Sequence, residues 1–207
     1  ASAAAARAIR LMNKGKYEIE PITAFVNPLA CNGCQLCLPS CAVKAIQMID
    51  DKAVVQGILC KGCGMCCSYC PQEAIDLAYY TKDQIYGEIE QALASKKPEE
   101  TRILIFADNT CAYRLADNVG TARLSYPAET RVIRLPSCSR ITPNMILYAF
   151  AKGADGIFFG ECDHKASPFT GASEAIQRNI HLAQQVMRQL GVNENRIYFA
   201  ELLASLL

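Results

Sequence analysis

The chain has 207 residues and a formal net charge of +1, and charged residues make up 20% of it. This length allows one large domain or two small ones, and the near neutrality gives no reason to expect nucleic acid or an anionic membrane surface as a partner. The longest apolar stretches fall far short of the ~20 residues that cross a bilayer, which argues against a direct membrane span.

An alanine-rich segment opens the sequence and predicts a helix. Its apolar residues Ile9, Leu11 and Met12 need a surface to pack against. The segment Ala1–Lys16 lacks the ordered basic, apolar and cleavage regions of a signal peptide. We therefore expect residues 1–20 to form a helical lead-in that packs on a larger assembly, and the protein to be cytoplasmic.

Cysteine is the unusual part of the composition, because nine of the twelve cysteines fall between Cys31 and Cys70. The run Cys-x2-Cys-x2-Cys-x3-Cys begins at Cys31 and returns at Cys60, an offset of 29 residues. A short helical turn is expected after each run, at Ala45-Ile46 and at Ala74-Ile75. The duplication predicts one α+β domain over residues 21–80, made of two copies of a cluster-binding unit.

This spacing matches the bacterial dicluster ferredoxin motif, in which the fourth cysteine of each run ligates the other cluster. The prediction is two [4Fe–4S] clusters. The first is expected to be held by Cys31, Cys34, Cys37 and Cys70. The second is expected to be held by Cys60, Cys63, Cys66 and Cys41. The glycines at 33, 62 and 64 suit loops that approach a cluster closely, and Cys67 is expected to be a small buried side chain.

Zinc is the main alternative, since Cys-x2-Cys pairs also bind zinc. A zinc site takes its four ligands as a rule in two pairs, whereas these runs interleave three ligands with one. Disulfide scaffolds are usually shorter, secreted and loop-rich, so metal-bound thiolates in a reducing compartment fit better. Between Asn27 and Tyr80 there are four acids and three lysines. A diffusing ferredoxin uses a strongly acidic face for steering, so this balance favours a subunit held in a complex.

A helix and a linker are expected over residues 81–100. Thr81–Gln84 has the pattern of a capping box, and Ile85, Ile89 and Leu93 keep helical spacing after it. The charged segment Lys96–Glu100 is typical of a linker, and we place the domain boundary there.

Residues 101–207 alternate strands with helices, which predicts an α/β domain with a parallel sheet of about four strands covered on both faces. The expected strands are Ile103–Ala107, Val132–Leu135, Gly156–Gly160 and Ile197–Ala200. One helix is expected from Thr142-Pro143 to Gly153, and another from Ser173 to Gly191.

Three further cysteines follow the first three of these strands: Cys111, Cys138 and Cys162. Because loops after parallel strands share one rim of the sheet, where ligands bind, the three thiols are a candidate redox or metal site. A metal would need a fourth ligand, for which Asp108, Asp163 and His164 are candidates. The alternative is three unrelated small residues near loop starts. His181 is expected to face solvent.

The duplicated cysteine run, with Ala3–Lys16 and Tyr17–Pro21 before it, resembles the C-terminal ferredoxin domain of the A-type subunit of heterodisulfide reductase. The stretch from about Arg102 to Leu203 resembles the delta subunit of methyl-viologen-reducing hydrogenase. The segments that carry this second resemblance are Arg131–Leu135, Arg140–Pro143 and Ala151–Gly156.

The resemblance implies an electron-transfer subunit of a heterodisulfide-reductase-like complex, with flavoprotein and iron–sulfur subunits as partners. FAD is expected in the partner domain or subunit, and Ala1–Lys16 resembles the last helix of that flavin domain. No substrate site of its own is evident in this chain. Two alternatives remain: a quinone-interacting, membrane-associated complex reached through partner subunits, and an independent ferredoxin with an appended docking domain. A bound subunit should expose an apolar patch around Ala1–Pro28.

The delta-subunit resemblance also implies a [2Fe–2S] cluster, but its cysteine positions carry other residues here. Arg114, Ser137 and Glu161 stand at three of them, and the expected Cys-His is missing around Ala166–Phe169. A [2Fe–2S] centre built with Cys111, Cys138 and Cys162 is one alternative, and a docking role without a cofactor is the other.

Overall fold

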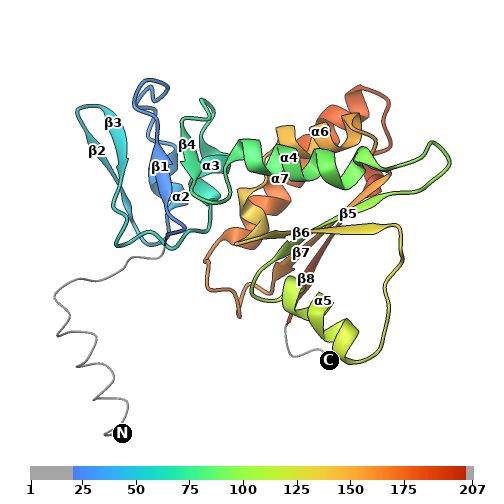
Figure 1. Ribbon diagram of the computed structural model, residues 1–207. Helices are drawn as coiled ribbons and strands as arrows, with labels where there is room; N and C mark the ends of the chain where they lie inside the picture. The colour runs from blue at the N-terminus through green and yellow to red at the C-terminus, as the bar shows by residue number, and fades with distance from the viewer. Residues whose placement is uncertain (1–20, 204–207) are drawn as a thin grey trace, which may run out of the picture.

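A computed structural model describes residues 21–203, so the helix expected over residues 1–20 lies outside the described part. The described chain forms two packed units, shown side by side in Figure 1. Within it, no helix combines the length and apolar character needed to cross a membrane.

The first unit consists of two antiparallel strand pairs and two short helices. Its elements are β1 (Ala24–Val26), α2 (Cys37–Ser40), β2 (Ile46–Ile49), β3 (Lys52–Val55), α3 (Met65–Tyr69) and β4 (Ile75–Leu77). Strand β1 pairs with β4, and β2 pairs with β3. The 29-residue offset relates β1 to β3 and β2 to β4, so each pair joins elements from both copies of the repeat.

The helical turns expected at Ala45-Ile46 and Ala74-Ile75 are wrong, because Ile46 and Ile75 begin strands β2 and β4. The helices α2 and α3 lie earlier, each just before the last cysteine of its run. Lys44 and Glu73 then have φ angles of 53° and 48°. These left-handed residues turn the chain away from helix, and the pleat that follows alternates buried with exposed side chains.

The second unit is an α/β layer with a four-stranded parallel sheet, as predicted. Its strands are β5 (Ile103–Asp108), β6 (Thr130–Leu135), β7 (Gly156–Cys162) and β8 (Ile197–Leu202), in the spatial order β6-β5-β7-β8. Figure 1 shows α4 (Lys82–Ala94), α6 (Pro143–Ala151) and α7 (Ala172–Gln189) on one face of the sheet and α5 (Ala112–Thr121) on the other. The helix α5 was not expected from the sequence.

The helix boundaries follow the capping chemistry closely. Thr81 forms the expected capping box with Gln84, and Thr142 caps α6 in front of Pro143. Helix α7 begins at Ala172, one residue before the expected start, and Gly191 follows its end with a φ of 70°. Two 3-10 helices, η1 (Cys138–Arg140) and η2 (Glu194–Arg196), complete this unit.

One continuous apolar core holds the second unit together. It runs from the buried sheet residues, such as Phe106 and Phe159, to the helices above them. Helix α4 contributes Ile85, Ile89 and Leu93 to this core. The segment that follows the cysteine repeat is thus packed into the second unit.

Arg140 in η1 joins the two units. Its side chain is only 2% exposed, and its guanidinium lies 2.6 Å from the Asp76 carboxylate and donates to the Tyr80 carbonyl at 3.0 Å. The stem crosses Gly64, where an added Cβ would lie 2.7 Å from Arg140 Cδ. Beside it, Met65 of α3 packs on Ala172 and Ala175 of α7.

Candidate functional site

The eight cysteines of the repeat line two separate cavities in the first unit. One, the Cys31 cavity, is lined by Cys31, Cys34, Cys37 and Cys70. The other, the Cys41 cavity, is lined by Cys41, Cys60, Cys63 and Cys66. Each cavity therefore combines three cysteines of one run with the last cysteine of the other, which are the two sets that the spacing predicts as ligands.

Backbone amides point at four of these sulfur atoms in a duplicated pattern. The donor–acceptor pairs are Ala53 N to Cys31 Sγ (3.5 Å), Ala24 N to Cys60 Sγ (3.4 Å), Ala45 N to Cys41 Sγ (3.2 Å) and Ala74 N to Cys70 Sγ (3.3 Å). The 29-residue offset converts the first pair into the second and the third into the fourth when the two copies are exchanged. Such N–H groups stabilise negative charge on sulfur, which a thiolate ligand carries.

Two glycines let the cysteine loops pass close to neighbouring backbone. Gly33 has a φ of 75°, and a Cβ there would lie 2.6 Å from the Asp51 carbonyl oxygen. Gly62 has a φ of 69°, and a Cβ there would lie 2.4 Å from the Ile22 carbonyl oxygen. Because these contacts are with backbone atoms, no side chain can move aside to admit a larger residue.

The thiol pKa values indicate cavities that need a positive group. Burial, and then the charges of the nearby Cys60 and Cys41, raise the pKa of Cys63 to about 11. Burial also raises the pKa of Cys37, with added repulsion from Cys70. At the more open Cys31, the hydrogen bond from the Ala53 amide lowers the pKa. A bound metal cation would supply positive charge that offsets the burial of these thiolates.

Cys67 lies outside both four-cysteine sets. Its side chain is 4% exposed and contacts Cys66 in α3. The hydrogen bond with Cys66 and the nearby Arg140 guanidinium lower the pKa of Cys67. The burial agrees with the predicted small buried side chain.

The two cavities differ in their surroundings. Pro168, Phe169 and Thr170 of the second unit contribute to the wall of the Cys41 cavity. The Cys31 cavity is lined by residues of the first unit alone. The second unit thus covers one half of the duplicated unit.

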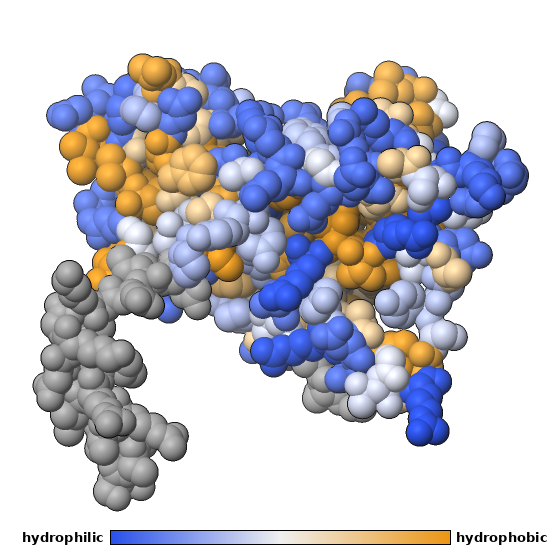
Figure 2. Space-filling model, in the orientation of Figure 1, coloured by the Kyte–Doolittle hydropathy of each residue, from blue (hydrophilic) through white to orange (hydrophobic). Residues whose placement is uncertain are grey.

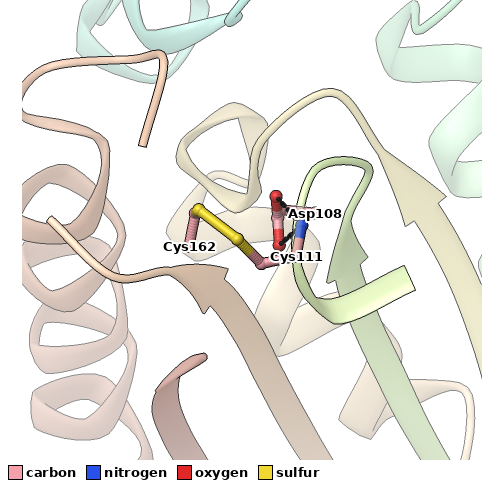
Figure 3. Close-up of side chains that lie close together, drawn as sticks. All are labelled: Asp108, Cys111 and Cys162. Atoms are coloured by element: carbon pink, nitrogen blue, oxygen red, sulfur yellow. Dashed lines mark hydrogen bonds between the residues drawn. A yellow bond between two sulfur atoms is a disulfide. The ribbon is translucent and has the colours of Figure 1, made fainter. Parts of the chain in front are cut away.

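At the rim of the parallel sheet, Cys111 and Cys162 form a disulfide, with 5.2 Å between their Cα atoms. Figure 3 shows Cys111 in the loop after β5 and Cys162 at the end of β7, with Asp108 beside Cys111. The Asp108 carboxylate accepts hydrogen bonds from the amides of Thr110, Cys111 and Ala112. Cys111 and Cys162 are two of the three cysteines that the sequence predicted together at this rim as a candidate redox or metal site.

Cys138 does not join this pair. It is fully buried, and its thiol donates to the carbonyl oxygens of Phe106 and Gly160, both at 3.3 Å. Asp108 is the acid that lies close to both Cys111 and Cys162. The other two candidate ligands, Asp163 and His164, gather with Glu201 in a separate and largely exposed group. His181 is exposed, as expected.

A buried polar series that was not predicted from the sequence adjoins the disulfide. Glu161 accepts hydrogen bonds from the Ser137 hydroxyl (2.9 Å) and from the Cys162 amide (3.2 Å). Ser137 contacts the Ser139 hydroxyl at 2.9 Å. Burial, and then the charge of Asp108, raise the pKa of Glu161 to about 7. Ser137 and Glu161 are two of the positions at which the resemblance implied cysteines, and that mismatch was the available signal.

Comparison with known proteins finds relatives for both halves of the chain. The family model for the delta subunit of methyl-viologen-reducing hydrogenase matches residues 103–206. The D-type iron-sulfur subunit of the vhc F420-non-reducing hydrogenase of Methanococcus voltae is 35% identical over 98 residues, which are 47% of this chain and 68% of that protein.

Longer similarity extends over the cysteine repeat as well. The A-type subunit of the ferredoxin:CoB-CoM heterodisulfide reductase of Methanosarcina mazei is 35% identical over 95% of this chain. The A-type subunit of the ferredoxin/F(420)H(2)-dependent CoB-CoM heterodisulfide reductase of Methanosarcina acetivorans is 34% identical over the same share. The chain spans about a quarter of the length of these two relatives (25% of each).

Proposed function

The chain belongs to the family of the methyl-viologen-reducing hydrogenase delta subunit, and from this premise we propose that it is an electron-transfer component of a heterodisulfide-reductase-like oxidoreductase complex. Its first unit is a dicluster ferredoxin-type domain that holds two [4Fe–4S] clusters. Each bound cluster would take up and release one electron at a time. FAD belongs to the partner domain or subunit.

The observation that carries this proposal is the pair of cavities, each lined by four cysteines drawn from both runs. Four thiolates per site match the ligand number of a [4Fe–4S] cluster. The chain's own residues hold and tune these sites. Backbone amides stabilise the sulfur charge, and apolar residues such as Ile46 and Ile75 line the cavities and exclude water.

The surface of the first unit supports a role inside a complex. Figure 2 shows hydrophobic residues gathered over this unit. Leu29 and Ile58, which occupy equivalent positions in the two copies, are 95% and 76% exposed. Within the patch expected around Ala1–Pro28, the described Phe25 is 49% exposed. Exposed apolar residues next to both cysteine loops suit contact with partner subunits at each cluster, a use that a freely diffusing ferredoxin does not need.

Iron and sulfide analysis of anaerobically purified protein tests the proposal. We expect about eight irons and eight sulfides per chain, and low-temperature spin-resonance spectra of two coupled [4Fe–4S] clusters after reduction. Stoichiometric zinc, or disulfides among the eight cysteines of the repeat, would refute it. About ten irons would add a [2Fe–2S] centre in the second unit.

Paired substitutions test which cysteines share a cluster. Cys31→Ala with Cys70→Ala removes two ligands of one proposed site, so about four irons should remain. Cys31→Ala with Cys41→Ala removes one ligand from each proposed site and should lower the iron content further. The reverse order would show that each run holds its own cluster. Cys67→Ala, which changes a buried cysteine outside both sets, is the matched control and should keep about eight irons.

A further inference from the structure

The Cys111–Cys162 disulfide stands alone in a chain of free thiols. The other ten cysteines, all within the described residues, are unpaired. The two cysteines meet because β5 and β7 are neighbouring parallel strands that end next to each other.

Solution thiols have no access to this disulfide. Cys111 is 3% exposed and Cys162 is fully buried. Exchange with an external thiolate needs direct attack on one of the two sulfurs, which this burial prevents. Electrons that reduce the disulfide must therefore arrive through the protein.

A continuous series of hydrogen bonds leads from the Cys41 cavity to the disulfide. The Ser139 hydroxyl donates to the carbonyl oxygen of Cys63 at 3.4 Å, and the Ser139 amide donates to the Ser137 hydroxyl oxygen at 3.1 Å. Ser137 donates to one carboxylate oxygen of Glu161, and the other oxygen accepts from the Cys162 amide. Ser137, Ser139 and Glu161 are all at most 1% exposed.

We propose that Cys111 and Cys162 form a redox-active dithiol/disulfide centre that stores an electron pair and exchanges it with the first unit through the Ser139–Ser137–Glu161 series. The proposal rests on the proposed function, because its reductant is a low-potential iron–sulfur cluster held by Cys41, Cys60, Cys63 and Cys66. Two electrons arrive singly, the S–S bond breaks, and two protons from solvent complete two thiols. Oxidation reverses each change.

Mass spectrometry of tryptic peptides tests this directly in the full chain with its clusters. Free thiols are alkylated in denaturant under anaerobic conditions, before and after treatment with dithionite. The oxidised protein should give the linked peptides 103–114 and 153–165, which carry the two cysteines. After reduction of the clusters, both peptides should be alkylated. The peptide 135–140, which carries Cys138, should be alkylated in both samples.

Electron counting gives a second readout. Wild-type protein should take up about four electrons per chain, about one for each cluster and two for the disulfide. Cys111→Ala should take up about two, with its iron content unchanged. Cys138→Ser is the matched control, since it changes a buried cysteine outside the pair, and it should take up about four. Cys162→Ala is the second variant, in case Cys111→Ala does not fold.

Two further variants test the path of the electrons. Cys41→Ala, which lacks one ligand of the adjacent cluster, should keep the linked peptides after the same dithionite treatment. Ser139→Ala should slow the loss of the linked peptides without changing the final electron count. Ser68→Ala, which removes a hydroxyl bonded only to the Met65 carbonyl in α3, should not slow it.

The outcomes separate this inference from the proposed function. Absence of iron would refute the function. Eight irons together with linked peptides that persist after full cluster reduction would make the disulfide a structural crosslink and overturn the inference. Two alkylated cysteines in the oxidised protein, or about ten irons with Cys111 and Cys162 protected only while iron is bound, would overturn it as well.

Discussion

Removing the Arg140 guanidinium should destabilise the packing of the two units, so that they unfold separately. Arg140→Met keeps the stem that crosses Gly64 and deletes the charge that faces Asp76 at 2.6 Å. Breaking a buried ion pair by removing one partner costs about 3–5 kcal/mol. The Asp76 side chain is 19% exposed, so solvent recovers part of this and the lower end, about 3 kcal/mol, applies.

Anaerobic urea unfolding of the cluster-loaded protein measures this loss. Far-UV circular dichroism follows the whole fold, and visible absorbance follows the proposed clusters of the first unit. With a urea slope of about 3 kcal/mol per molar, the midpoint should fall by about 1 M. The two signals should coincide in the wild type and diverge in Arg140→Met, because the units then unfold separately.

Arg188→Met is the matched control. Arg188 also pairs with a carboxylate, Glu194 at 2.8 Å, but its side chain is 63% exposed, so the expected loss is only about 0–1 kcal/mol. Adding Asp76→Asn to Arg140→Met should restore part of the stability, since it removes the unpaired charge. Equal midpoints for Arg140→Met and Arg188→Met would refute the view that Arg140 holds the units together.

Three further predictions follow from local geometry. Gly62→Ala should lower the iron content, because the added Cβ would meet the Ile22 carbonyl. Gly191→Ala is the control: it has a similar φ with open space around it, and it should keep its iron. Equal iron contents in the two variants would contradict this prediction. The raised pKa of Glu161 means that the folded state keeps a proton that the unfolded state loses, so stability falls as pH rises from about 4.5 to about 7. Glu161→Gln should flatten the melting temperature over that range, and an unchanged profile would contradict the assignment. Thr142→Ala should cost about 1 kcal/mol in thermal unfolding through loss of the α6 cap, and no change would show that the cap is dispensable.

The sequence predicted the elements whose signals are local. Thr81 and Thr142 carry complete capping patterns, and the apolar strands of the second unit are long enough to stand out. Helix α5 was not predicted, because Cys111 before its first residue makes no side-chain cap and Ala112 is its only buried residue. The strand that begins at Ile46 was wrongly predicted as a helical turn, because a two-residue apolar pair fits a helix or a strand equally well.

The candidate site divides in the same way. The spacing of the cysteines within each run is local, so it predicted which side chains would share a cavity. The pairing of Cys111 with Cys162 depends on the sheet order, in which β5 lies directly beside β7. Cys138 follows β6, yet its thiol turns inward to backbone carbonyls. The sequence pattern alone does not show which of these cysteines pair and which one remains a free, buried thiol.

The second unit packs on only one half of the duplicated domain, so the two cysteine cavities have different surroundings. Duplication alone yields two equal halves. Two identical cluster sites would have equal redox potentials, and electron transfer between them would have no preferred direction. Here Gln35, exposed, stands where the other copy needs Gly64 to admit Arg140. Shielding from water on one side only makes the two environments unequal, and unequal hydration shifts redox potential. The second unit thereby makes the two proposed cluster sites unequal, because it covers the Cys41 cavity and not the Cys31 cavity.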